Sequence, residues 1–160
     1  MIQLDFLELV EVFRDLNDDQ LLAVRDCCGE AKYRRGDTIF SVNEEPLFLW
    51  AVIDGEVTLA QETPGRARPE KDPIATLSTT MTFGWSSLVP PFKYMLSATC
   101  TSIRCRLLKV DRECLKKLFE EDLELAYLAM LRIASLVGSR FHQLREEIIK
   151  KRGQDIMNRW

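Results

Sequence analysis

The middle of the chain alternates short apolar segments with turn signals, and this pattern limits the possible folds more than any other feature of the sequence. From Ala31 to Val110 the apolar segments are too short for helices. They are separated by Gly36–Asp37, by Asp54–Gly55 and by the polar, proline-bounded loop 64–73. An Asp-Gly pair between two apolar segments is typical of a β-hairpin, so the segments on either side of Gly55 are predicted to pair. Many short strands at this spacing predict a β-roll, barrel or sandwich.

Helical patterns flank this region on both sides. Residues 2–14 are predicted to form a short amphipathic helix, and Asn17 with Gln20 makes the capping box of a second helix that Gly29 would end. Asp111 is predicted to cap a further helix. We therefore expect N-terminal helices over 1–29, a β-roll over 30–110 and C-terminal helices over 111–160.

A long helix is predicted after Asp122, because apolar residues recur there at heptad spacing without a break. In the first half of this helix the faces outside the heptad positions are apolar as well, so this half is expected to be buried on all sides. In the second half only a narrow apolar stripe at the heptad positions remains. One interpretation is a core helix packed inside a single subunit. The narrow stripe favours a second one, a parallel dimer whose seam is formed by Leu123, Tyr127, Met130, Ala134, Val137, Phe141, Leu144 and Ile148.

Composition excludes several classes of function. The net charge of −3 and the pI near 5.3 argue against a strongly basic nucleic-acid-binding surface. No apolar run approaches the ~18 residues of a membrane span, and the N-terminus lacks the pattern of a signal peptide, so the protein is expected in the cytoplasm.

The cysteines and the single histidine give no sign of a metal site or of catalysis. The five cysteines are odd in number and lack CxxC spacing, so we expect reduced, mostly buried thiols. His142 has no nucleophile motif beside it, and no pair of carboxylates stands in a catalytic pattern. We therefore expect no metal, no cofactor and no enzymatic activity.

Several motifs, in order along about residues 5–145, resemble the cyclic nucleotide-binding domain of the catabolite-activator and fumarate-nitrate-regulator superfamily. "RRGDTIF" contains the family's Gly-Asp turn, Glu45–Pro46 precedes a strand with Trp50, and "IDGEVTL" places Gly55 at the family's second glycine. "TFGWSSLVPP" is similar to the phosphate-binding cassette, which opens with Phe-Gly. The resemblance implies a mainly β fold with flanking helices, a β-roll of the double-stranded β-helix (jelly-roll) type, with a cassette at 82–99 and a long dimerisation helix.

Two charged residues of the family's cassette are replaced. In members that bind cyclic nucleotides, a glutamate directly after Phe-Gly holds the ribose, and an arginine about ten residues later neutralises the phosphate; here Trp85 and Leu96 stand at these positions. Losing the arginine alone is expected to weaken cyclic nucleotide binding by at least about two orders of magnitude. The backbone N–H groups of Ser86, Ser87 and Leu88 would still be able to face an anion. The basic side chains considered as substitutes for the arginine are Lys93, Arg104 and Arg106.

The replacements leave two expectations for the pocket. Trp85 and Leu96 either line a hydrophobic cavity for an apolar or aromatic molecule, or pack on each other and close it. Phe92 and Tyr94 are expected to pack on the roll. The candidate ligand-binding residues are Phe83, Gly84, Trp85, Ser86, Ser87, Leu88, Leu96, Ser97, Ala98, Thr99 and Arg140.

The expected function is that of a regulatory sensor module that binds a small molecule other than a cyclic nucleotide and signals through its dimer helix to a partner protein. Residual binding of cAMP or cGMP through other basic residues is one alternative. A ligand-free dimerisation module with a closed pocket is another. Because nothing after the long helix resembles a helix-turn-helix domain, direct DNA binding is not expected. The basic cluster at 150–152 is interpreted as a solvated helix end.

Overall fold

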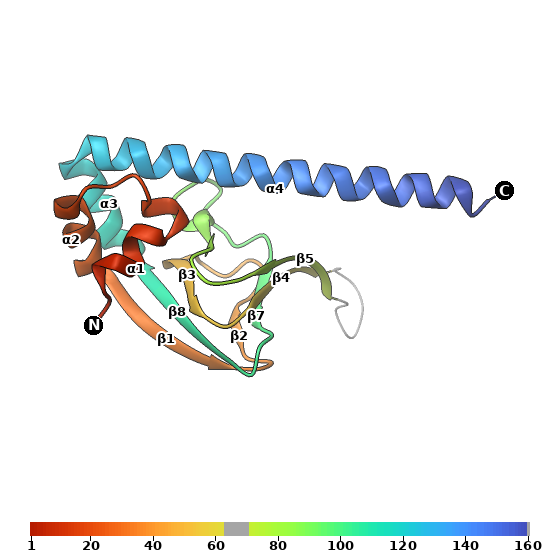
Figure 1. Ribbon diagram of the computed structural model, residues 1–160, viewed down its shortest axis with the longest axis horizontal. Helices are drawn as coiled ribbons and strands as arrows, with labels where there is room; N and C mark the ends of the chain where they lie inside the picture. Colours follow the sequence, from red (N-terminus) through yellow and green to blue (C-terminus); the bar gives the residue numbers. More distant parts are fainter. Residues whose placement is uncertain (63–70, 160) are drawn as a thin grey trace.

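The β-strands form two four-stranded antiparallel sheets that face each other across an apolar core (Figure 1). The computed structural model describes residues 1–62 and 71–159. One sheet has the order β1 (Cys28–Arg34), β8 (Arg104–Asp111), β3 (Phe48–Asp54), β6 (Thr82–Phe83); the other has β2 (Thr38–Phe40), β7 (Ser97–Cys100), β4 (Val57–Glu62), β5 (Lys71–Leu77). The predicted β-roll is therefore confirmed. Most of the predicted loop 64–73 lies outside the described residues, and its last part is the start of β5.

The turn at Gly55 is present, but the predicted hairpin is wrong. β3 and β4 lie in different sheets, so the chain crosses from one sheet to the other at this turn. Gly55 has a φ of +92°, and a Cβ atom there would collide with the backbone oxygen of Arg104 and lie 2.7 Å from Ser102 Oγ. Glycine is required because the turn between β7 and β8 packs directly against it.

The N-terminal region forms two short helices where one was predicted. Helix α1 (Leu4–Leu9) ends at Val10, which is extended, and a 3₁₀ turn η1 (Glu11–Phe13) follows. The backbone N–H of Glu11 donates to Thr80 O, and its carboxylate accepts from the N–H of Thr82. The helix is interrupted because the N–H of Glu11 bonds the roll instead of a carbonyl of the preceding helical turn.

Helix α2 (Asp18–Asp26) begins as predicted and ends earlier. Both capping-box bonds are present, since Gln20 N donates to Asn17 Oδ1 at 2.9 Å and Asn17 N donates to Gln20 Oε1 at 3.0 Å. Gly29 does not end the helix; it lies within β1 and pairs with Lys109 of β8. Pairing with β8 therefore extends β1 back to Cys28.

Four of the five cysteines form disulfides, so the expectation of reduced thiols is wrong for this structure. Cys27, after α2, is bonded to Cys114 in α3 (Arg112–Glu121), and Cys100 is bonded to Cys105 across the turn between β7 and β8. Cys28 is free, and burial raises the pKa of its thiol to about 12. Spacing along the chain did not reveal these pairs because packing between separate elements creates them.

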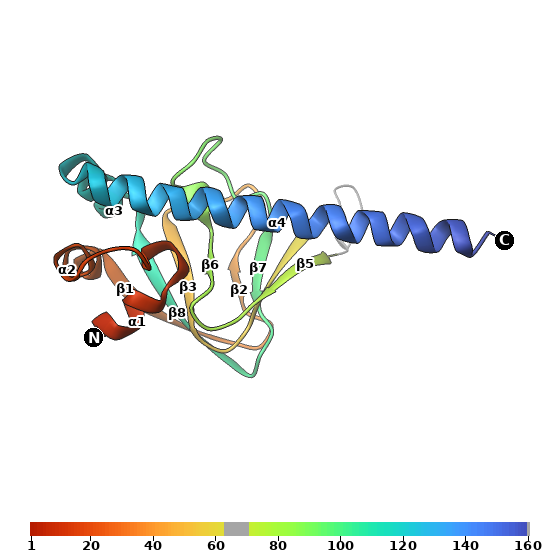
Figure 2. The same cartoon turned by 45° about the horizontal axis from the view of Figure 1, so that its top comes forward.

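The predicted long helix is α4 (Leu123–Met157), which runs along the whole roll and extends beyond it (Figures 1 and 2). The caps at its start and at the start of α3 are as expected, because Asp122 and Asp111 each accept from a backbone N–H three residues on. Within the chain, α4 buries Leu125, Ala129 and Ile133 against the N-terminal helices and the first sheet.

Most of the predicted dimer seam lies on a different face of α4 and is exposed in the single chain. Tyr127 and Phe141 are each 64% exposed, whereas Met130 packs partly against the core. Leu131 is exposed, so the first half of α4 is not buried all round within one chain. Helix α4 also continues past the basic cluster at 150–152, which lies inside it and is exposed. The dimer therefore stays a prediction.

Candidate functional site

The segment 82–99, which resembles the cassette, opens with β6 and a tight turn, and a single turn of 3₁₀ helix, η2 (Trp85–Ser87), follows. Gly84 has a φ of +74°, and a Cβ atom there would lie 2.9 Å from Cδ1 of Trp50. Ser87 N donates to Gly84 O and Leu88 N donates to Trp85 O. The prediction that the N–H groups of Ser87 and Leu88 face an anion is therefore wrong, because both are already hydrogen-bonded within the turn.

A cavity of about 280 Å³ lies between the roll and α4, beside this turn. Of the predicted pocket residues, those that line it are Gly84, Trp85, Ser86, Leu96 and Arg140. Trp85 is only half-buried and forms part of the wall, so it does not fill the space. Trp85 and Leu96 therefore lie at the wall of one cavity.

The remaining predicted pocket residues do not line the cavity. Phe83, Ser87, Ser97 and Ala98 are buried completely within the roll. Leu88 packs against the apolar cluster formed by the N-terminal helices, α4 and the first sheet. Thr99 pairs with Thr38 of β2. These residues lie next to the site in sequence, but strand alternation and the 3₁₀ turn direct them elsewhere.

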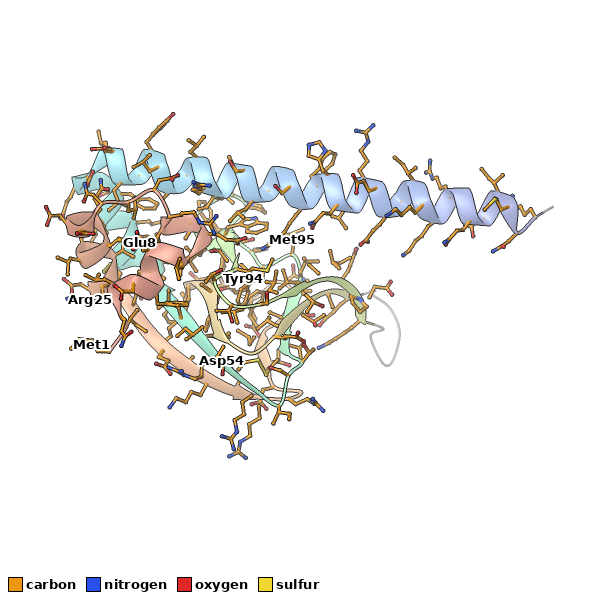
Figure 3. The ribbon with its side chains drawn as sticks, viewed as in Figure 1. Met1, Glu8, Arg25, Asp54, Tyr94 and Met95 are labelled. Atoms are coloured by element: carbon orange, nitrogen blue, oxygen red, sulfur yellow. A yellow bond between two sulfur atoms is a disulfide. The ribbon has the colours of Figure 1, made fainter. Side chains whose placement is uncertain are left out.

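Six further residues of the roll line the cavity, and sequence reasoning did not assign them to it: Phe40, Leu59, Ile74, Ala75, Tyr94 and Met95. Figure 3 shows Tyr94 and Met95 on the side of the roll that faces α4. Tyr94 packs on the roll as expected, with its ring centroid 3.6 Å from that of Phe40, and it lines the cavity as well. Its hydroxyl donates to Phe48 O and accepts from the Trp50 indole, so it is not free for a ligand.

Helix α4 contributes the rest of the wall through Val137, Arg140, Phe141 and Leu144. Three of these were predicted for the dimer seam. The cavity and the proposed seam therefore share residues, a link that the heptad pattern alone did not reveal.

Arg140 is the charged residue of this wall and is held against the cassette. Its Nη2 donates to Thr82 O at 2.5 Å, and its Cζ lies 4.3 Å from the centre of the Trp85 ring. Burial lowers the pKa of the guanidinium to about 10, and the nearby carboxylate of Glu11 partly opposes this shift. Arg140 Nη1 and Thr82 Oγ1 are both buried without a hydrogen-bond partner among the described residues.

The three basic residues that the sequence offers as substitutes for the family's cassette arginine lie elsewhere. Lys93, Arg104 and Arg106 are exposed and do not line the cavity. Arg106 Nε pairs with Glu30 at 2.9 Å. Arg140 is the cation that the fold brings to the site, and it comes from α4 instead of the cassette.

Comparisons with known proteins agree with this architecture. No protein-family model matches the chain. Human cGMP-dependent protein kinase 2 is 31% identical over 85 residues, which is 53% of this chain and 11% of the kinase; the mouse and rat enzymes match equally. The chain thus spans about a tenth of the length of these curated relatives.

Solved structures match over most of the chain. A protein of Geobacter metallireducens assigned as cyclic nucleotide-binding is 25% identical with a TM-score of 0.75, covering 89% of this chain and 100% of that one. The catabolite activator protein of Thermus thermophilus is 22% identical with a TM-score of 0.70, covering 86% and 61%. The sensor domain of the Pseudomonas aeruginosa regulator DNR is 17% identical with a TM-score of 0.69, covering 89% and 91%. The chain therefore has the cyclic nucleotide-binding β-roll fold of these solved structures.

Proposed function

We propose that this domain is a non-enzymatic sensor that binds a small, mainly apolar molecule in the cavity between the roll and α4. The observation that carries the proposal is the lining of that cavity. Trp85 and Leu96 make its wall apolar where a cyclic nucleotide needs a carboxylate and a cation. A preformed concave apolar site with few polar groups is the usual form of a small-molecule site.

Helix α4 is the element through which such a site would signal. Its first half is fixed to the body by buried Leu125, Ala129 and Ile133 and by the ion pair of Arg132 with Asp15. Farther along α4, Arg140 contacts the roll at Thr82 O and at the Trp85 ring, and Arg140 and Trp85 both line the cavity. A ligand there would alter the contacts of the second half of α4 while leaving the first half in place, and a partner protein would detect that change.

Ligand titration tests this proposal. Indole, as a neutral aromatic probe, is expected to raise the melting temperature of the wild-type protein, because a ligand that binds only the folded state stabilises it by mass action. cAMP and cGMP are expected to bind no more tightly than roughly 0.1 mM, since both charge-assisted anchors are lost. Thermal shift and calorimetry measure both effects.

Two variants on strand β5 control the titration. Ala75→Phe fills the cavity from its wall and should abolish the response to indole, whereas Thr76→Phe, at the exposed neighbouring position, should preserve it. A response that survives in Ala75→Phe would place the probe elsewhere and contradict the proposal. Micromolar binding of cAMP would favour the alternative of a nucleotide sensor that uses Arg140.

The proposal includes a homodimer formed through α4, acting in the cytoplasm without a cofactor. Tyr127→Asp is expected to give monomers at micromolar concentration, because a charge in an apolar seam loses its solvation when the helices pair. Tyr127 does not line the cavity, so this change leaves the ligand site intact. Light scattering measures the mass, and Ser139→Asp, exposed on the same helix outside the seam, is the matched control. A wild-type monomer at every accessible concentration would contradict the dimer.

None of the helices in the described residues combines the length and apolar character that crossing a membrane requires.

A further inference from the structure

The unsatisfied polar atoms beside the cavity belong to one contacting pair of residues. Among the described residues, the buried side-chain atoms without a hydrogen-bond partner are Arg140 Nη1 and Thr82 Oγ1. These two residues are joined by the bond from Arg140 Nη2 to Thr82 O. Buried polar atoms are nearly always paired, so the unpaired Nη1 of Arg140, a residue that lines the cavity, indicates that its guanidinium has room for a further polar partner.

No carboxylate directly contacts the positive charge of the Arg140 guanidinium among the described residues. Within the described residues, no carboxylate forms a salt bridge with Arg140. Glu11 acts on the guanidinium only through space, and its carboxylate is engaged by the backbone N–H of Thr82. A half-buried guanidinium held by one carbonyl and the face of an indole is a strong site for an anion.

The other residues that line the cavity determine the polarity of the part of the ligand that does not contact Arg140. Apart from Arg140, the described residues that line it are uncharged, and most are apolar. The Tyr94 hydroxyl is already engaged by Phe48 O and the Trp50 indole. The site therefore combines one cationic position at the α4 wall with an apolar space of about 280 Å³.

From this geometry we infer that the ligand is an apolar molecule carrying one carboxylate, which pairs with Arg140 while its apolar body lies against Trp85 and Leu96. This inference rests on the proposed function and specifies its ligand class. Because Nη1 is buried, pairing requires the guanidinium to turn from the Trp85 ring toward the cavity. The turn breaks the contacts that tie the middle of α4 to the cassette, which gives the ligand a direct effect on that helix.

Matched acids and amides test the inference. 4-Phenylbutyrate is titrated calorimetrically against 4-phenylbutyramide, and octanoate against octanamide, in wild type, Arg140→Gln and Arg140→Lys. In wild type each acid is expected to bind about tenfold or more tightly than its amide, because hydrogen bonds to a charged partner are the stronger ones. Arg140→Gln should remove this preference, and Arg140→Lys should keep part of it.

The controls separate a ligand contact from a structural role. Arg145→Gln removes a charge from an exposed position of the same helix and should leave the preference unchanged. Loss of stability in Arg140→Gln alone would not mimic the expected result, since it would weaken the acid and the amide equally. Melting curves without ligand confirm that the variants are folded.

The possible outcomes have different consequences for the two proposals. Equal binding of acid and amide by wild type, or a preference that survives in Arg140→Gln, overturns the inference and leaves the proposed function standing. Binding of neither acids nor amides nor indole at concentrations up to about 5 mM overturns both. Preference for the acid that depends on Arg140 supports both.

Discussion

Gly55→Ala is expected to lower the free energy of unfolding by about 3 kcal/mol or more, whereas Gly36→Ala should lower it by only about 1 kcal/mol. Both glycines have a positive φ, +92° at Gly55 and +89° at Gly36, so the backbone strain of an L-residue is similar at the two sites. The difference comes from their surroundings. A Cβ atom at Gly36 has nothing within 4 Å, but one at Gly55 collides with Arg104 O.

The collision at Gly55 would also disrupt the hydrogen bonds around it. Ser102 Oγ donates to Arg104 O at 2.7 Å and accepts from the N–H of Glu56 at 2.9 Å. Moving the turn between β7 and β8 to admit a methyl group strains both bonds. Urea denaturation of the two variants measures the effect. Equal losses of stability would contradict the prediction and show that the turn between β7 and β8 moves to accommodate the methyl group.

Cys114→Ser is expected to lower the free energy of unfolding by about 4 to 5 kcal/mol under non-reducing conditions. The disulfide from Cys27 to Cys114 closes a loop with a sequence separation of 87 residues, and a cross-link of that span removes much conformational freedom from the unfolded chain. It also joins the end of α2 to α3, two elements that are distant in the chain. The short separation of 5 residues between Cys100 and Cys105 implies a smaller effect for that disulfide.

Redox conditions provide the control. With a phosphine reductant present, Cys114→Ser and wild type should unfold at similar denaturant concentrations, because both then lack the cross-link. Cys28→Ser, which changes the free thiol, should differ little from wild type under both conditions. Thiol titration of the unreduced protein in denaturant should find one reactive cysteine. Five would contradict the pairing and restore the expectation of reduced thiols.

The sequence predicted features that depend on neighbours along the chain. The capping box at Asn17, the caps at Asp111 and Asp122 and the long helix that follows are present because their hydrogen bonds join residues within four positions. Where a group distant in the chain competed for a backbone N–H, prediction failed. The helix expected over 2–14 is interrupted because the backbone N–H of Glu11 donates to Thr80 O, in the turn before β6.

The residues alone were therefore enough to predict the order of the elements and a resemblance to a nucleotide-binding roll, in which Trp85 and Leu96 stand where the resemblance leads one to expect charged side chains. Tertiary packing, by contrast, sets which strands pair and which cysteines are bonded, and it brings Arg140 of α4 to the Trp85 ring. The physical reason is the same in each case. Local propensities act over a few residues, whereas a cavity wall or a disulfide depends on how elements distant in the chain pack against one another.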